Sequence, residues 1–140
     1  MQGDELRTRR EGSKGKTASR AAPSVALASP VTAILKLAAW SCLVVLGLLS
    51  LLPAAYVTRT GYGAHLEHFV AYLGTAGMFC LAYRSRRQAV MIAMGLAAAA
   101  ALFELAQYVS PGRTPALGTW AVSTTGALAS GVIGLLIARR

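Results

Sequence analysis

Several polar side chains that can exchange protons or hold a polar ligand lie inside apolar segments of the chain: His65, Glu67, His68, Glu104 and Gln107. An ionisable group inside a segment that spans lipid is costly, so each such group is a functional-site hypothesis. Arg113 follows in the next connection. A carboxylate, an imidazole and a guanidinium at one place are typical of a ligand pocket or of general acid–base catalysis.

The motifs of a nucleophilic enzyme or a metal site do not accompany these residues. Ser123 is the serine nearest to them in the last apolar segment, but it is not part of a G-x-S-x-G turn. His65 and His68 could bind a metal or haem, but the other segments supply no further histidine. The two cysteines lie among apolar neighbours without the spacing of ligands. The sequence therefore predicts no catalytic motif, no metal and no cofactor.

Four apolar runs must position the polar residues, and they cover residues 31–52, 64–83, 89–109 and 117–138. A helix that rises ~1.5 Å per residue needs about 20 residues to cross ~30 Å of hydrocarbon, which is the length of each run. Lipid offers no partner to an unpaired backbone group, so these spans must be helical. Short connections make neighbouring spans antiparallel. The predicted fold is therefore all-α, an up-down bundle of four transmembrane helices within residues 31–140.

The composition supports a membrane protein. Hydrophobic residues make up 55% of the chain and charged residues 14%, whereas a soluble domain has roughly 25% charged residues. The net charge of +9 would suit nucleic acid, but the basic residues flank the apolar runs instead of covering a folded face. We therefore predict no nucleic-acid partner. Residues 1–30 are basic and poor in large apolar side chains, which predicts a disordered tail that is attracted to anionic lipid.

The distribution of Lys and Arg predicts the orientation in the membrane. The tail, Lys36, the connection at 84–87 and the end of the chain are basic, whereas the connections 53–63 and 110–116 hold one basic residue each. Both termini are therefore predicted to be cytoplasmic, in a multi-pass protein of the cytoplasmic membrane. The two weakly charged connections then face outward, together with the polar ends of the second and third spans.

The second span has a polar arc and an apolar arc. At ~100° per residue, Glu67, His68 and Tyr72 fall on the arc that also carries small residues. The opposite arc is apolar and carries Leu66, Phe69, Val70, Leu73 and Leu81. We therefore expect the polar arc to face the bundle and the apolar arc to face lipid.

The third span carries the carboxylate that most needs a partner. Glu104 lies ~7 Å inside the end of this span, on the same small-residue face as Gln107, so we expect it to point into the bundle. Its candidate partners are Arg113, His65 and His68, and protonation is the other way to remove the charge. Arg113 is the favoured partner because a guanidinium is always charged and matches the shape of a carboxylate. Such a pair is either part of a functional pocket or a buried ion pair that sets helix register.

The fourth span completes the polar layer and carries a packing motif. Thr119 and Ser123 lie near its outer end. Gly126, Ser130 and Gly134 then repeat every four residues. Small residues at this spacing let helices approach closely. We interpret this stripe as packing within the bundle rather than as a dimer interface.

The order of these pieces resembles the VanZ-like family of small bacterial membrane proteins. The resemblance covers about residues 50–138 and lies in the segments LEHFVAY at 66–72 and FELAQ at 103–107, the PGR turn at 111–113 and the last span. Members commonly have Asp and Asn where this chain has Thr119 and Ser123. The founding member is linked to low-level resistance to the glycopeptide antibiotic teicoplanin, so the resemblance implies a role in the cell envelope. The missing Asp puts in doubt any family activity that needs it.

The sequence thus favours a non-enzymatic envelope protein with an outward-facing polar pocket, formed by Glu67, His68, Tyr72, Glu104, Gln107, Arg113, Thr119 and Ser123. Its expected partners are the lipid bilayer and an envelope lipid, a cell-wall precursor or another protein. The alternative is a membrane-embedded enzyme that acts on a lipid-linked substrate, with His68 as general base and Glu104 as acid. A transporter or proton path fits less well because it needs ionisable groups at several depths.

Overall fold

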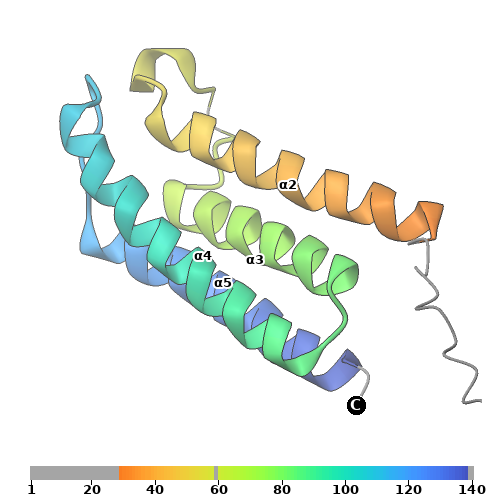
Figure 1. The fold of residues 1–140 in the computed structure, drawn as a ribbon. Coiled ribbons are helices and arrows are strands. Elements are labelled where there is room, and N and C mark those ends of the chain that lie inside the picture. The colour runs from red at the N-terminus through yellow and green to blue at the C-terminus, as the bar shows by residue number, and fades with distance from the viewer. Residues whose placement is uncertain (1–28, 59, 139–140) are drawn as a thin grey trace, which may run out of the picture.

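The computed structural model describes residues 29–58 and 60–138. It contains the helices α2 (Pro30–Leu51), α3 (Ala64–Ala82), α4 (Arg86–Ala106) and α5 (Leu117–Ile137), with the short 3₁₀ helices η1 (Ala54–Tyr56) and η2 (Gln107–Val109) after α2 and α4 (Figure 1). The described residues form no strand, which confirms the all-α prediction. The predicted tail, apart from its last two residues, lies outside the described residues, as do Arg59 and the last two residues of the chain.

Serine caps decide where two of the helices begin. The Oγ of Ser29 accepts a hydrogen bond from the backbone N of Thr32 at 3.3 Å, which satisfies one of the unpaired donors at the start of α2. The Oγ of Ser85 accepts one from the backbone N of Gln88 at 3.2 Å in the same way. Because of this second cap, α4 begins at Arg86, three residues earlier than the predicted start of the third span at 89.

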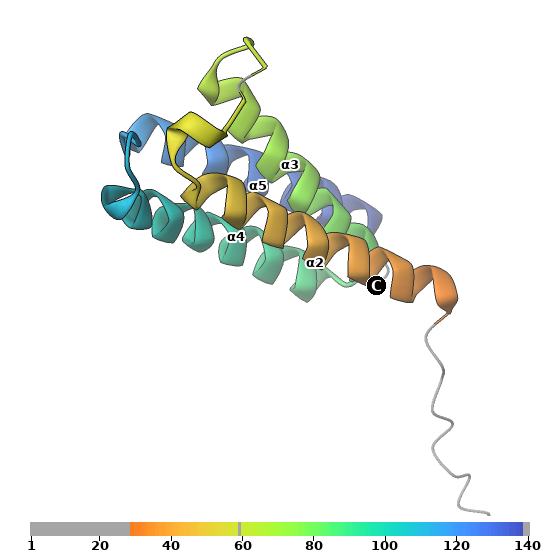
Figure 2. The ribbon, with the colours of Figure 1, turned by 90° about the horizontal axis from the view of Figure 1, so that it is seen from above.

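The helices run up and down, as predicted. The start of α2, the α3–α4 turn and the end of α5 lie at one end of the bundle, which we call the terminal end (Figures 1 and 2). The connections 52–63 and 107–116 lie at the opposite end, which we call the loop end. All the predicted polar residues near the ends of α3 and α4 therefore gather at the loop end.

The central helix of the bundle is α3. It packs most extensively against α5, then against α2, and it also touches α4. Its Tyr72 and Ala76 are buried in one cluster with Leu46 of α2 and Leu96 of α4. The predicted bundle-facing position of Tyr72 is therefore confirmed.

The apolar arc of α3 is only partly exposed, and in this the prediction was wrong. Leu66 and Val70 are half exposed, as a lipid-facing surface requires. Phe69 and Leu73 are partly buried instead, because α5 covers that side of α3 and places Gly126 against the backbone of Phe69. A helix with neighbours on opposite sides has little surface left for lipid.

The small-residue stripe of α5 packs against α3, as predicted. A Cβ atom added to Gly126 would lie 2.5 Å from the carbonyl oxygen of Phe69. The Oγ of Ser130 donates a hydrogen bond to the carbonyl oxygen of Leu73 at 2.6 Å. Gly134 is buried against the same helix, so the stripe lies inside the bundle.

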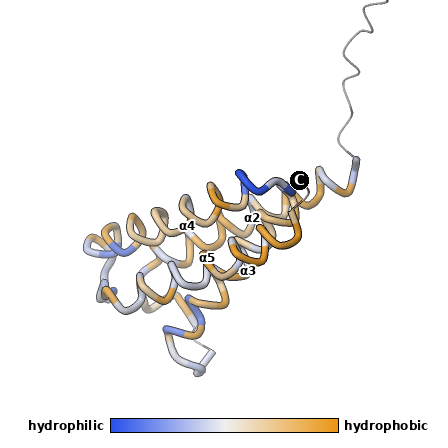
Figure 3. Tube along the Cα trace, turned by 90° about the horizontal axis from the view of Figure 1, so that it is seen from below, coloured by the Kyte–Doolittle hydropathy of each residue, from blue (hydrophilic) through white to orange (hydrophobic). Residues whose placement is uncertain are grey.

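Three helical segments are long and apolar enough to cross a membrane: Pro30–Leu51, Arg86–Val109 and Leu117–Ile137. The composition and length of these helices indicate a membrane protein. In Figure 3 hydrophobic residues dominate the middle of the helices, whereas the hydrophilic ones gather toward the ends of the bundle. The remaining helix, α3, is less apolar because it carries His65, Glu67 and His68 in its first turns. This helix contacts all three of the other long helices.

Candidate binding site

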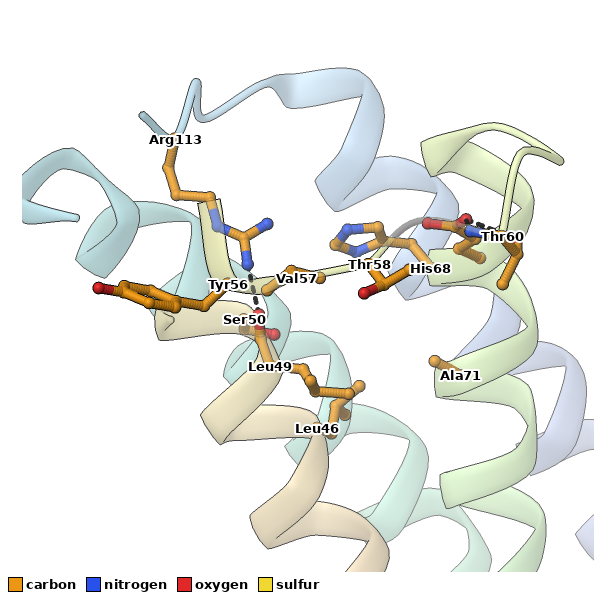
Figure 4. A pocket seen from close by; sticks show the side chains of 11 residues that line it. Leu46, Leu49, Ser50, Tyr56, Val57, Thr58, Thr60, His68, Ala71 and Arg113 are labelled. Carbon is orange, nitrogen blue, oxygen red and sulfur yellow. Dashed lines mark hydrogen bonds between the residues drawn. The ribbon is translucent and has the colours of Figure 1, made fainter. Parts of the chain in front are cut away.

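A cavity of about 480 Å³ lies at the loop end between α2 and α3. It is lined by parts of α2, of the α2–α3 connection and of α3, and by one residue of the α4–α5 connection: Leu46, Leu49, Ser50, Tyr56, Val57, Thr58, Thr60, Glu67, His68, Ala71 and Arg113 (Figure 4). We call it the α2–α3 cavity. Three of the predicted site residues, Glu67, His68 and Arg113, line it together.

Glu67 ties the α2–α3 connection to the start of α3. Its Oε1 accepts hydrogen bonds from the backbone N of Thr60 at 2.7 Å and from the Oγ1 of Thr60 at 2.6 Å. Glu67 also lies in the first turn of α3, where the positive end of the helix dipole favours a carboxylate. Its carboxylate thereby orders the wall of the cavity.

His68 connects the cavity to α5. Its Nδ1 lies 3.3 Å from the Oγ of Ser123, and the imidazole is seen in Figure 4 on the side of the cavity opposite to Arg113. Ser123 is only 2% exposed. The serine therefore acts as a buried support for the orientation of the imidazole ring.

Arg113 closes the end of α2. Its Nε donates a hydrogen bond to the carbonyl oxygen of Leu52 at 2.9 Å, and its Nη2 donates one to the carbonyl oxygen of Leu49. The last carbonyls of a helix lack partners within the helix and form its negative end. The residue that would otherwise donate to the carbonyl of Leu49 is Pro53, which has no N–H. The guanidinium supplies the missing donor.

Glu104 has a different partner from the predicted Arg113. Its Oε2 accepts a hydrogen bond from the backbone N of Ala116 at 2.9 Å, and Ala116 is the residue that precedes the first turn of α5. The carboxylate therefore meets the positive end of α5, while the guanidinium of Arg113 meets the negative end of α2. Two opposite charges that were expected to pair instead each stabilise the end of a helix.

The predicted polar layer is thus divided between two places. Glu104 lines a second cavity of about 340 Å³ between the end of α4 and the start of α5. Tyr72 lies inside the bundle, near enough to Glu104 for an electrostatic interaction. Gln107 is buried in η2, and Thr119 is half buried in the first turn of α5.

The sequence analysis missed the contribution of the α2–α3 connection and of the end of α2. Tyr56, Val57, Thr58 and Thr60 form one wall of the α2–α3 cavity, and Leu49 forms part of another. A signal for the end of α2 was present, since Pro53 marks a helix end whose carbonyl groups need donors from elsewhere. No comparable feature of the sequence predicts the path of the α2–α3 connection.

The enzymatic alternative requires His68 and Glu104 to act on the same substrate. His68 lines the α2–α3 cavity, whereas Glu104 lines the second cavity. The Nδ1 of His68 lies within hydrogen-bond distance of the hydroxyl of Ser123, which is buried. This geometry favours a binding site over an acid–base pair.

Comparison with known protein families, curated proteins and solved structures gives no match. The resemblance to the VanZ-like family therefore stays a prediction. It rests on the segments 66–72, 103–107 and 111–113, and two of these segments contribute residues to the α2–α3 cavity.

Proposed function

We propose that this protein is a multi-pass protein of the bacterial cytoplasmic membrane that binds a phosphate-bearing envelope lipid in the α2–α3 cavity. The observation that carries this proposal is the shape and chemistry of the cavity. Arg113 and His68 lie at its mouth on opposite sides, whereas Leu46 and Ala71 lie one helical turn further into the bundle. A polar mouth above an apolar floor suits a ligand with a polar head and an apolar tail.

The arrangement of the helices supports the proposed membrane topology. α2 has 22 residues and α3 has 19, and the two run side by side in opposite directions. If α2, α4 and α5 cross the bilayer, α3 crosses it with them, shielded by its neighbours. Arg84, Arg86 and Arg87 lie at the terminal end. The positive-inside rule therefore favours a cytoplasmic position for that end and an outer position for the α2–α3 cavity.

The hydrogen-bond donors of Arg113 and His68 favour an acidic headgroup, whereas the carboxylate of Glu67 in the same lining accepts hydrogen bonds from Thr60. A guanidinium matches phosphate and carboxylate oxygens in geometry, and an imidazole adds a hydrogen-bond donor. Phospholipids and lipid-linked cell-wall precursors share a phosphate group next to the apolar chain. Both are present at the outer surface of the membrane, where glycopeptide antibiotics act. We propose reduced susceptibility to teicoplanin-type glycopeptides as the cellular consequence, as the VanZ-like resemblance implies.

The test uses two neighbouring leucines of α2. Leu49 lines the cavity, so Leu49→Trp should fill it. Leu48 is 58% exposed and outside the lining, so Leu48→Trp adds the same side chain on the outer surface. Retention of phosphatidylglycerol by the purified full chain in a non-ionic detergent would be measured by native mass spectrometry. Leu49→Trp should weaken binding about tenfold, equivalent to ~1.4 kcal/mol, and Leu48→Trp should leave it unchanged.

Equal retention by the two variants would contradict the proposed site. Retention of an uncharged diacylglycerol as strongly as phosphatidylglycerol would contradict the role of the phosphate. The cellular consequence is tested in a bacterial host by the teicoplanin concentration that inhibits growth. The full-length protein and Leu48→Trp should raise this concentration, and Leu49→Trp should not.

A further inference from the structure

The second cavity, which we call the α4–α5 cavity, has a different chemistry from the α2–α3 cavity. It lies between the end of α4 and the start of α5, and its lining is a carboxylate, two aromatic rings and apolar side chains: Ala101, Glu104, Leu105, Tyr108, Pro115, Ala116, Leu117 and Trp120. Its volume of about 340 Å³ lies within the ordinary range for small-ligand sites, about 300–1,000 Å³. Among residues 29–58 and 60–138, no Lys, Arg or His contributes to the lining.

The carboxylate of Glu104 is the acidic group that the described residues contribute to this lining. Within the part of the chain that the structure describes, its hydrogen bond is with the backbone N of Ala116. The N-terminal end of a helix carries roughly half a positive charge. A full negative charge beside an apolar cavity is therefore only partly balanced, which favours a cation in the cavity.

The aromatic residues add a second preference for a cation. Trp120 and Tyr108 line the same cavity and are 38% and 75% exposed. The face of an aromatic ring attracts ammonium groups, and tryptophan does so most strongly. Leu105 and Leu117 supply apolar surface beside the rings. A small hydrated metal ion would gain nothing from this surface, whereas an organic ammonium with an alkyl chain would.

We propose that the α4–α5 cavity binds the ammonium group of an amphiphile. Glu104 would provide the ionic contact, Trp120 and Tyr108 the ring contacts, and the leucines the contact with the alkyl chain. This site is independent of the acidic headgroup proposed for the α2–α3 cavity. Two sources share the required chemistry, an aminophospholipid of the membrane and a free cationic amphiphile from outside.

The test uses Trp120 as its own reporter. Trp40 and Trp120 are the two tryptophans of the chain. Trp40→Phe removes the other fluorophore but keeps an aromatic ring next to Phe79. The full-length Trp40→Phe protein in dodecyl maltoside would be titrated with dodecyltrimethylammonium, and in parallel with an uncharged dodecyl surfactant. The cation should change the Trp120 emission saturably, and the uncharged surfactant should not.

Glu104→Gln is the decisive variant because glutamine keeps an oxygen that can accept from Ala116 N while it removes the charge. The affinity for the cation should fall at least about tenfold. Glu67→Gln removes the carboxylate of the other cavity and should leave the titration unchanged. Equal responses to cation and uncharged surfactant, or unchanged affinity in Glu104→Gln, would overturn the proposal.

Nanodiscs distinguish the two sources. If phosphatidylethanolamine occupies the cavity, nanodiscs that contain it should reduce the response to dodecyltrimethylammonium relative to nanodiscs in which an uncharged glycosyl diacylglycerol replaces it at the same content of phosphatidylglycerol. An equal response in both identifies a free amphiphile as the ligand. Retention of phosphatidylglycerol by Glu104→Gln measures binding in the α2–α3 cavity alone. Each of the two proposed sites can therefore be refuted without affecting the test of the other.

Discussion

The two sides of α3 are built in different ways. Toward α5 the contact is between backbones, with Gly126 against Phe69 and the Oγ of Ser130 bonded to the carbonyl oxygen of Leu73 at 2.6 Å. Toward α2 the contact is made by large rings at the terminal end. The rings of Trp40 and Phe79 have centroids 5.2 Å apart in an edge-to-face arrangement.

The ring contacts continue beyond this pair. Phe79 stacks on Tyr83 at 6.1 Å, the Nε1 of Trp40 donates to the hydroxyl of Tyr83 at 3.3 Å, and the Nζ of Lys36 lies 5.1 Å from the centroid of the Tyr83 ring. At the loop end the same two helices are separated by the α2–α3 cavity instead. We conclude that α5 fixes the position of α3 by close packing. By contrast, α2 is held at its terminal end by aromatic rings and at its loop end by Arg113.

The largest expected effect comes from the α5 side. In Gly126→Leu the new Cβ would lie 2.5 Å from a backbone oxygen, which cannot turn away as a side chain can. Such overpacking should cost about 3 kcal/mol or more. Unfolding in mixed micelles of dodecyl sulfate and dodecyl maltoside, followed by circular dichroism, measures the loss.

Gly74→Leu is the matched control for this variant. A Cβ at Gly74 meets no atom within 4 Å, and the residue is exposed on the central helix α3. It should retain nearly the stability of the wild type. If both variants lost the same stability, the cause would be the replacement of a helical glycine by leucine. The close contact of α3 with α5 would then not explain the loss in Gly126→Leu.

A smaller effect is expected at the terminal end of the α2 side. Phe79 is 6% exposed and contacts the rings on both helices, so Phe79→Ala removes the centre of the ring cluster. In lipid the loss is one of packing rather than of the hydrophobic effect, so we expect about 2 kcal/mol. The same unfolding measurement checks it.

Leu81→Ala provides the comparison for Phe79→Ala. Leu81 is 44% exposed on the same helix, so its truncation should cost clearly less. In Phe79→Ala, hydrogen exchange should also rise in α2 and not in α5. Faster exchange in α5 would show that the loss of the ring cluster also loosens the contact between α3 and α5. It would contradict the inference that the two sides of α3 are held independently.

The smallest effect on stability is expected at the loop end. Arg113→Gln removes the guanidinium that donates to the carbonyls of Leu49 and Leu52. Charged donors form stronger hydrogen bonds than neutral ones, but both of these bonds are exposed to solvent and glutamine keeps a donor. We therefore expect a net loss of about 1 kcal/mol and a small shift of the unfolding transition. Hydrogen exchange of the peptide that covers residues 48–58 should instead increase about fivefold as the end of α2 frays.

Arg84→Gln controls for the loss of one positive charge, since Arg84 is exposed at the terminal end. It should leave exchange at residues 48–58 unchanged. Unchanged exchange in Arg113→Gln as well would mean that the guanidinium does not hold the end of α2, and the α2 wall would then depend on its rings alone.

Much of the fold could be predicted from local features of the sequence. The lengths of the apolar runs predict four helices, and Gly126, Ser130 and Gly134 predict a close helix contact because their spacing places them on one face. The lipid-facing arc of α3 was predicted only in part. A helical wheel shows which residues share a face but does not show how many neighbours surround the helix, and α3 has them on opposite sides.

The candidate site was predicted as a set of residues but not as an arrangement. Glu67 and His68 are consecutive residues, so they lie side by side in any fold. Glu104 and Arg113 were expected to pair by charge, yet each meets a helix end. Those partners are backbone groups, which have the same chemistry at every residue and become distinctive only where a helix stops.

The residue types and their order along the chain determined by themselves that the protein is helical, that it suits a membrane and that its polar groups gather at one end, because hydrophobic length and helical periodicity are local properties. The packing of the helices divides these groups between two separate cavities. The physical reason is that a charge can be balanced by a side chain or by a helix terminus, and the choice depends on which helix ends the packing of α2, α4 and α5 brings within reach.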